Sequence, residues 1–146
     1  MRFSLSALAV IVDGHGRVLL AHRTDVDLWN VPGGGVERGE SPWDAVVREA
    51  REETGLEVRI ERLAGVYAKP DQDVVAFAFL CRVHDGEPVA TDEADEVRFF
   101  ALDELPTNIS PRQVERIRDT VEHDGAVMRV QRGRPATEML ERGELG

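Results

Sequence analysis

The sequence contains only one cysteine, Cys81, so no disulfide can form within the chain. Cys81 lies in an apolar run, which predicts a buried thiol and favours a reducing compartment, the cytoplasm. No apolar stretch approaches the roughly 18 residues that a membrane-spanning helix requires, so no membrane partner is expected. The apolar N-terminus runs directly into Asp13-Gly14 without a small-residue cleavage site, which favours a first strand over a signal peptide.

Basic residues are also scarce, with 18 against 28 acidic ones and a formal net charge of −10. A surface this acidic repels polyanions and argues against a long nucleic acid as partner. It does not exclude a small phosphorylated ligand, because bound metal ions reverse the sign of the charge locally. The 146 residues contain no internal repeat, low-complexity tract or linker. They predict one domain over residues 1–132 and a polar tail over 133–146, either disordered or part of an interface such as that of a homodimer.

Strands and turns alternate along most of the chain. We expect a hairpin from residues 5–12 and 17–22, joined by the turn "DGHG", and a short extended segment at 28–31 that ends at Pro32 and the following glycines. Further strands are expected at 57–67, 74–83, 97–101 and 126–130.

Two helices are expected between these strands. The first has Ser41 as N-cap, Pro42 at its first position, and Gly55 just past its end. The second opens at Ser110-Pro111 and places Val114, Ile117 and Val121 on one face. "LDELP" predicts one short helical turn. Two separated helices among strands predict an α/β (α+β) sandwich with helices flanking a mixed sheet.

The first helix has two contrasting faces on a helical wheel. One face carries apolar side chains and is predicted to pack into the core: Trp43, Val46, Val47 and Ala50. The opposite face gathers three carboxylates with an arginine and an alanine: Ala45, Arg48, Glu49, Glu52 and Glu53.

As ordinary surface decoration, this acidic face is unfavourable. Glu49 and Glu53 form a like-charge pair four residues apart, and Glu49 and Glu52 form one three residues apart, each costing about 0.2–0.5 kcal/mol. Acids in the last turns also oppose the helix dipole. The arrangement is favourable if a divalent cation binds between the carboxylates, because Mg²⁺ and Mn²⁺ prefer oxygen ligands and substrate phosphates.

The flanking residues extend this pattern to G-x5-E-x7-R-E-x-x-E-E-x-G over residues 34–55, followed by Leu56. The fixed positions are Gly34, Glu40, Arg48, Glu49, Glu52, Glu53 and Gly55. This pattern resembles the Nudix box of the Nudix hydrolases, the MutT-like proteins. Ala50 is a mild departure, since the family usually has a larger aliphatic residue there. "LWNVPGG" and "VRFFALDELP" also resemble the family, so the likeness covers roughly residues 4–106.

The resemblance implies an α/β/α sandwich that hydrolyses a nucleoside diphosphate linked to another group, with Mg²⁺ or Mn²⁺. By position, Glu52 and Glu53 would be the primary metal ligands, with the Gly34 carbonyl as a further one. Glu49 would be either a ligand or the base that activates water. Arg48 would fix the helix carboxylates, and Glu40 would support the loop.

The general base is not settled by the box, since some family members use a glutamate on a later loop. In "ATDEADEVRFF" the preferred candidates are Glu93 and Glu96. Candidate substrate contacts are Arg23, Trp29 and Tyr67: Arg23 for a phosphate, and the two aromatic residues for a base, although aromatic residues in strands more often belong to the core.

The leading hypothesis is hydrolysis of a small nucleotide: a nucleotide sugar, ADP-ribose or a nucleoside triphosphate. A nucleotide sensor without turnover is an alternative, but such domains usually have eroded boxes. An RNA-end pyrophosphohydrolase is another, but it would need a basic track, and the sequence offers only "RGR" at 132–134.

Overall fold

β1 (Ser4–Ile11) is the first element of the computed structural model, which describes residues 2–145. The remaining strands are β2 (Val18–Arg23), β3 (Trp29–Asn30), β4 (Gly33–Gly35), β5 (Glu57–Lys69), β6 (Val74–Asp85), β7 (Ala94–Phe100) and β8 (Val127–Val130). The helices are α1 (Pro42–Thr54), α2 (Pro111–Glu122) and α3 (Ala136–Glu141), with single 3₁₀ turns at Pro70–Gln72 and Leu102–Glu104. The second 3₁₀ turn falls where "LDELP" predicts it.

The strands form two sheets. One has five strands in the order β4-β1-β6-β5-β8, and the other has three in the order β3-β2-β7. β1 runs parallel to β6 and β5 runs parallel to β8, whereas the other pairs are antiparallel. The prediction of a mixed sheet is therefore confirmed.

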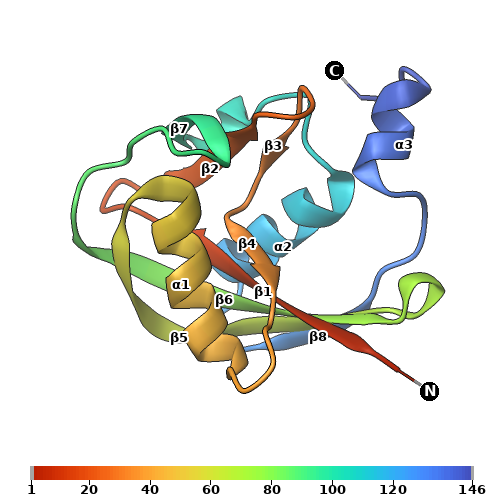
Figure 1. The fold of residues 1–146 in the computed structure, drawn as a ribbon, viewed down its shortest axis with the longest axis horizontal. Helices are drawn as coiled ribbons and strands as arrows, with labels where there is room; N and C mark the ends of the chain where they lie inside the picture. Colours follow the sequence, from red (N-terminus) through yellow and green to blue (C-terminus); the bar gives the residue numbers. More distant parts are fainter. Residues whose placement is uncertain (1, 146) are drawn as a thin grey trace.

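Alternate side chains of β1 enter different apolar clusters, as the two-residue period of a strand requires. Leu8 and Val10 belong to the cluster that includes Ile117 of α2, whereas Ala9 and Ile11 belong to the cluster of α1. The two helices therefore cover opposite faces of the five-stranded sheet, and Figure 1 shows α1 crossing β1, β5 and β6. The layers are helix, sheet and helix, as expected.

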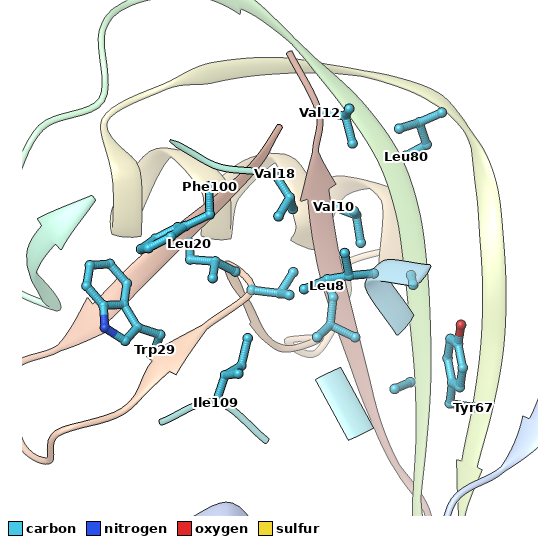
Figure 2. Packing of buried hydrophobic residues seen from close by; sticks show 14 residues of the cluster. Leu8, Val10, Val12, Val18, Leu20, Trp29, Tyr67, Leu80, Phe100 and Ile109 are labelled. Carbon is cyan, nitrogen blue, oxygen red and sulfur yellow. The ribbon is translucent and has the colours of Figure 1, made fainter. Parts of the chain in front are cut away.

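The expected hairpin between β1 and β2 is wrong in one respect. The turn exists, closed by a single bridge between Val12 and Val18, but the two strands then enter different sheets. Both strands carry apolar side chains that belong to one buried cluster, and this cluster lies between the two sheets. Figure 2 shows Val10, Val18 and Leu20 directed into the same cluster, so the strands separate to enclose these side chains.

The ends of α1 are where the sequence predicts them. The Ser41 side chain accepts a hydrogen bond from the Asp44 N–H at 3.0 Å. Gly55 terminates the helix at φ 76°, a conformation that favours glycine, and its N–H donates to the Arg51 carbonyl at 3.0 Å.

The predicted orientation of α1 is wrong by part of a turn. Trp43, expected in the core, has 59% of its surface exposed, whereas Ala45, expected on the solvent side, is fully buried. Trp43 lies in the first turn of the helix, and the buried arc centres on Val46 and Ala50. This rotation brings Glu49 and Glu53 to the edge of the core, where both are partly buried.

α2 begins at the predicted cap, Ser110, but its apolar face is narrower than expected. Val121 is exposed, and polar side chains are buried beside Ile117: Arg116, Asp119 and Thr120. The expected tail contains α3, which stands apart at the C-terminal end in Figure 1. None of the helices within residues 2–145 is both long and apolar enough to cross a membrane.

Candidate active site

Three carboxylates meet between α1 and the loop that precedes β7. Glu49 and Glu53 come from α1 and Glu93 from the loop, and each offers an oxygen atom within 4.8 Å of the other two. We call these three residues the acidic cluster. Glu49 and Glu53 are partly buried and Glu93 is exposed, so the cluster opens to solvent on the side of Glu93.

Glu53 is the most deeply placed carboxylate of the cluster. Burial raises its pKa to about 8, and repulsion from Glu49 and Glu93 adds to this effect. The N–H of Gly33 in β4 opposes it by donating a hydrogen bond to Oε2 of Glu53 at 3.1 Å. The three carboxylates therefore repel one another at this spacing unless a cation lies between them.

Glu49 is placed by a glycine and an arginine. Burial raises its pKa, and the neighbouring Arg48 guanidinium opposes the rise with a hydrogen bond of 3.0 Å to Oε1. Gly34 of β4 lies so close that a Cβ atom there would be 2.5 Å from Oε1 of Glu49. Only glycine allows this approach of β4 to the helix carboxylate.

Arg48 ties the loop after β4 to α1. It forms a bidentate pair with Glu40, with Nε to Oε2 at 2.8 Å and Nη2 to Oε1 at 2.9 Å, and Nη2 also donates to the Gly35 carbonyl at 3.1 Å. This pairing lowers the pKa of Glu40 to about 2 and raises that of Arg48. The remaining nitrogen, Nη1, donates to Glu49 and, at 3.2 Å, to Glu52.

Glu52 lies outside the acidic cluster. Its side chain is 44% exposed and pairs with Arg48 on the outer side of the helix. Its assignment as a metal ligand, and that of the Gly34 carbonyl, therefore stay predictions.

The two candidate bases occupy different places. Glu93 joins the acidic cluster, whereas Glu96 lies on β7 and pairs with Arg98 at 3.3 Å. Thr91, which the sequence analysis did not single out, holds the loop: its hydroxyl donates to the Glu53 carbonyl and accepts from the Glu93 N–H, each at 3.2 Å. A threonine hydroxyl can bond the backbone N–H two residues further on, and this turn tendency is the local signal that could have identified Thr91.

Two of the three candidate substrate residues belong to the core. Tyr67 is fully buried and its hydroxyl donates to Asp119 at 2.8 Å. Trp29 is 7% exposed and packs edge to face against Phe100, as Figure 2 shows. Neither ring has a free face for a base, so the interpretation of Trp29 and Tyr67 as substrate contacts is wrong and the core interpretation holds.

Arg23, the third candidate, lies at the end of β2 and pairs with Asp25 through two hydrogen bonds of 2.6 and 2.8 Å. Arg23 and Asn30 line a small cavity together with Glu53 and Glu93. The same two residues also line a larger cavity of about 260 Å³ on the side of α2. Arg23 therefore lies between the acidic cluster and a second hollow.

The acidic cluster fits a hard divalent cation. It offers three carboxylate oxygens and no soft ligand, which is the donor set that Mg²⁺ and Mn²⁺ prefer. A cation would also offset the repulsion that raises the pKa of Glu53. The residues present therefore fit the metal that the box implies.

Comparisons with known proteins give a consistent result. The family model described as the NUDIX domain matches residues 2–120. The chain is 32% identical over 131 residues to a "MutT-like protein" of Streptomyces ambofaciens, covering 90% of this chain and 85% of that one. It is 42% identical over 109 residues to an "ADP-ribose pyrophosphatase" of Methanocaldococcus jannaschii, covering 67% and 64% of the two chains. Among solved structures, an ADP-ribose pyrophosphatase of Streptococcus suis is similar with a TM-score of 0.73 and 28% identity, covering 89% and 100% of the chains.

Proposed function

This chain belongs to the Nudix hydrolase family, and from that premise we propose that it is a divalent-metal-dependent pyrophosphohydrolase of small nucleoside diphosphate derivatives. Its relatives are named for ADP-ribose and for 8-oxo-dGTP, a nucleoside triphosphate, and the Nudix box also implies nucleotide sugars. The proposed substrate is therefore ADP-ribose, a nucleotide sugar or a nucleoside triphosphate. The observation that carries the proposal is the convergence of Glu49, Glu53 and Glu93 within 4.8 Å.

Glu49, Glu53 and Glu93 hold Mg²⁺ or Mn²⁺ in this proposal, with Glu52 and the Gly34 carbonyl as further predicted ligands. The bound metal neutralises phosphate charge and lowers the pKa of a coordinated water. Phosphoryl transfer depends mainly on positioning and charge neutralisation, so the task of the protein is to keep these carboxylates in place. Arg48 does so from outside the cluster, through its contacts with Glu40 and Glu49.

The base that accepts a proton from the attacking water is Glu93 or Glu49. Glu93 is the exposed member of the cluster and lies on the side open to solvent and substrate. Glu96 is set aside because its partner is Arg98. Arg23 contacts a substrate phosphate, and its ion pair with the exposed Asp25 is replaced by a pair with the phosphate.

We also propose a cytoplasmic location, supported by the buried free thiol of Cys81. A single domain over residues 1–132 and a homodimer stay predictions.

The test is release of phosphate and nucleotide across a panel of small nucleotides, with Mg²⁺, with Mn²⁺ and with a chelator. Glu53→Gln serves as the blank, because glutamine keeps an oxygen that accepts from Gly33 but lacks the charge. We expect turnover to fall by orders of magnitude in the variant and to stop with the chelator, while the melting temperature of the metal-free protein is retained.

Full activity of Glu53→Gln, or turnover that persists in the chelator, would contradict the metal assignment. Silence of the wild type across the panel, combined with nucleotide-induced melting shifts, would instead indicate a nucleotide sensor.

A further inference from the structure

A second hollow opens beside the acidic cluster, between α2, the end of β5 and the segment that leads into α3. It encloses about 260 Å³. We call it the basic cavity, because its lining includes four cationic side chains and no carboxylate: Arg23, Lys69, Arg112 and Arg116. The chain as a whole has a net charge of −10, so a cavity lined by four cations and no carboxylate has the opposite charge to the rest of the protein.

Arg116 is the most deeply buried of these cations, with 4% of its surface exposed. Its guanidinium lies over the Tyr67 ring at 5.2 Å and donates through Nε and Nη2 to the Gln131 side-chain carbonyl at 3.1 and 2.8 Å. None of the ion pairs formed within residues 2–145 includes Arg116. The acceptor of these hydrogen bonds is neutral, and the exposed Glu115, which attracts Arg116, is too far away to form an ion pair with it and accepts from Nε2 of Gln131 at 3.0 Å. Burying the guanidinium is therefore costly unless a ligand supplies a closer counter-charge.

The nearest buried acid does not supply it. Asp119 lies on the same helix, but both of its oxygens accept from Arg129 at 2.7 Å, and one also accepts from the Tyr67 hydroxyl. Asp119 is therefore engaged by Arg129 of β8 and Tyr67 of β5, and neither of these residues lines the basic cavity.

Of the other three cations, Arg23 pairs with Asp25, whereas Arg112 and Lys69 lack carboxylate partners among the described residues. Arg112 donates to neutral oxygens, the Gln72 side chain at 3.3 Å and the Gly133 carbonyl. Lys69 takes part in no ion pair of the described chain, and burial together with Arg116 and Arg112 lowers its pKa to about 8. Positive charges thus repel one another inside the cavity, as carboxylates do in the acidic cluster.

The two sites are neighbours. Arg23 and Asn30 line the basic cavity on one side and the small hollow of Glu53 and Glu93 on the other. A ligand whose diphosphate lies at the acidic cluster can therefore extend past Arg23 into the basic cavity.

We propose that the basic cavity binds a second phosphate group of the substrate, separate from the diphosphate that is cleaved. This inference rests on the proposed function and narrows it to nucleotides that carry an additional phosphate. That phosphate comes either from a longer polyphosphate chain or from a phosphate ester on the group beyond the diphosphate. The guanidinium groups of the cavity can donate two parallel hydrogen bonds to phosphate oxygens, and the Lys69 ammonium adds a further positive charge.

The first experiment measures binding without metal, so that it is independent of turnover. Pyrophosphate is titrated calorimetrically into the full chain in excess chelator, where the acidic cluster repels anions. Arg112→Gln and Lys69→Gln are compared with Arg118→Gln, an exposed arginine of the same helix that pairs with Glu122 and lies outside the cavity lining. We expect pyrophosphate binding to weaken about tenfold in each cavity variant and to remain unchanged in Arg118→Gln.

Because Arg116→Gln removes a buried side chain, it is used only if its melting temperature matches that of the wild type. Absence of pyrophosphate binding to the wild type, or equal weakening in Arg118→Gln, would overturn the proposal. Glu53→Gln keeps all four cations of the cavity, so it should still bind pyrophosphate although it is expected not to hydrolyse substrate, and a failure of the proposed hydrolysis remains distinguishable from a failure of the basic cavity.

The second experiment identifies the source of the phosphate. kcat and KM are measured for two series in Mg²⁺: a nucleoside di-, tri- and tetraphosphate, and a nucleotide sugar with and without a phosphate ester on its sugar. We expect Arg112→Gln to raise KM about tenfold for the more phosphorylated members of one series and to leave kcat almost unchanged. Equal effects on all members of both series would overturn the proposal.

Discussion

Gly34 lies directly against the carboxylate of Glu49, at a distance that leaves no room for a side chain. A Cβ atom at this position would lie 2.5 Å from Oε1 of Glu49. At the preceding residue, Gly33, a Cβ atom would instead lie 2.5 Å from the Ala7 backbone oxygen, whereas at Gly35 it would meet nothing within 4 Å. The three glycines of β4 therefore carry different constraints.

Alanine substitutions at these three positions should separate activity from stability. In Gly34→Ala the obstacle is the end of a flexible side chain, so the fold should tolerate the methyl group while the Glu49 carboxylate moves. We expect kcat/KM to fall about 100-fold, with little change in the melting temperature.

The other two variants are the controls. Gly33→Ala meets backbone and should lose about 1–3 kcal/mol of stability. Gly35→Ala should resemble the wild type in both thermal melting and steady-state kinetics. An active Gly34→Ala enzyme would show that the position of Glu49 has no role in catalysis.

The roles of Glu93 and Glu96 are separable by matched amide variants. Glu93 joins the acidic cluster and Glu96 pairs with Arg98. We expect Glu93→Gln to lower kcat/KM by about 10²–10⁴-fold, as loss of a ligand or base does, and Glu96→Gln to change it by no more than about twofold.

A metal titration then distinguishes ligand from base. If Glu93 is chiefly a ligand, the variant needs more Mg²⁺ or Mn²⁺ and regains rate when the metal is saturating. If it is the base, kcat stays low at saturating metal, and Glu49→Gln shows the ligand behaviour instead. Greater loss in Glu96→Gln than in Glu93→Gln would contradict the assignment.

Arg48 and Arg51 are two arginines of α1 that pair with carboxylates in different surroundings. The side chain of Arg48 is 20% exposed and contacts Glu40, Glu49, Glu52 and the Gly35 carbonyl. Arg51 is 54% exposed and pairs with Glu57. Lysine preserves the charge but cannot reproduce the arginine fork.

We therefore expect Arg48→Lys to lower the melting temperature by a few degrees and kcat/KM by about tenfold or more, because the loop and the Glu49 carboxylate lose their common anchor. Arg51→Lys should change neither quantity appreciably, since exposed pairs contribute little. Equal effects in calorimetry and kinetics would show that Arg48 is an ordinary surface arginine.

Local signals account for the parts of the site that were predictable. The caps of α1, Ser41 and Gly55, and the carboxylate spacing between Glu49 and Glu53 are set by neighbours in the chain, so a single sequence contains them. The buried arc of α1 is different. A helical wheel gives only the relative directions of the side chains. Whether Trp43 contacts the sheet depends on how the first turn of α1 is positioned relative to the sheet, and the wheel does not contain this information.

Long-range contacts account for what was missed. β7 begins at Ala94 and not at residue 97, which places Glu96 within the strand beside Arg98 and leaves Glu93 in the loop. The basic cavity joins Lys69 to Arg112 and Arg116, which lie more than 40 residues further along the chain. No local pattern connects these residues, because α2 and β5 meet only in the folded protein.

His22 of β2 contacts two carboxylates, those of Asp27 and of Asp95 in β7. Its Nε2 lies 2.8 Å from Oδ1 of Asp27, and its Nδ1 lies 2.8 Å from Oδ1 of Asp95, two residues beyond Glu93. The hydrogen bond with Asp27, followed by that with Asp95, raises the pKa of His22 above its ordinary value of 6.5, although partial burial opposes the rise. The protonated ring donates to both carboxylates and holds the start of β7 against β2.

This shift fixes the sign of a pH effect. Because the folded protein binds the His22 proton more tightly than the unfolded chain does, the stabilisation is complete below pH 6.5 and is lost as the pH rises through the higher folded-state pKa. Melting temperatures of the wild type, His22→Asn and His15→Asn are compared between about pH 6 and about pH 9. We expect His22→Asn to lose less stability over this range than the wild type, while His15→Asn, altered at an exposed turn, follows the wild type. Identical slopes for all three proteins would show that the two carboxylates do not hold a proton on His22.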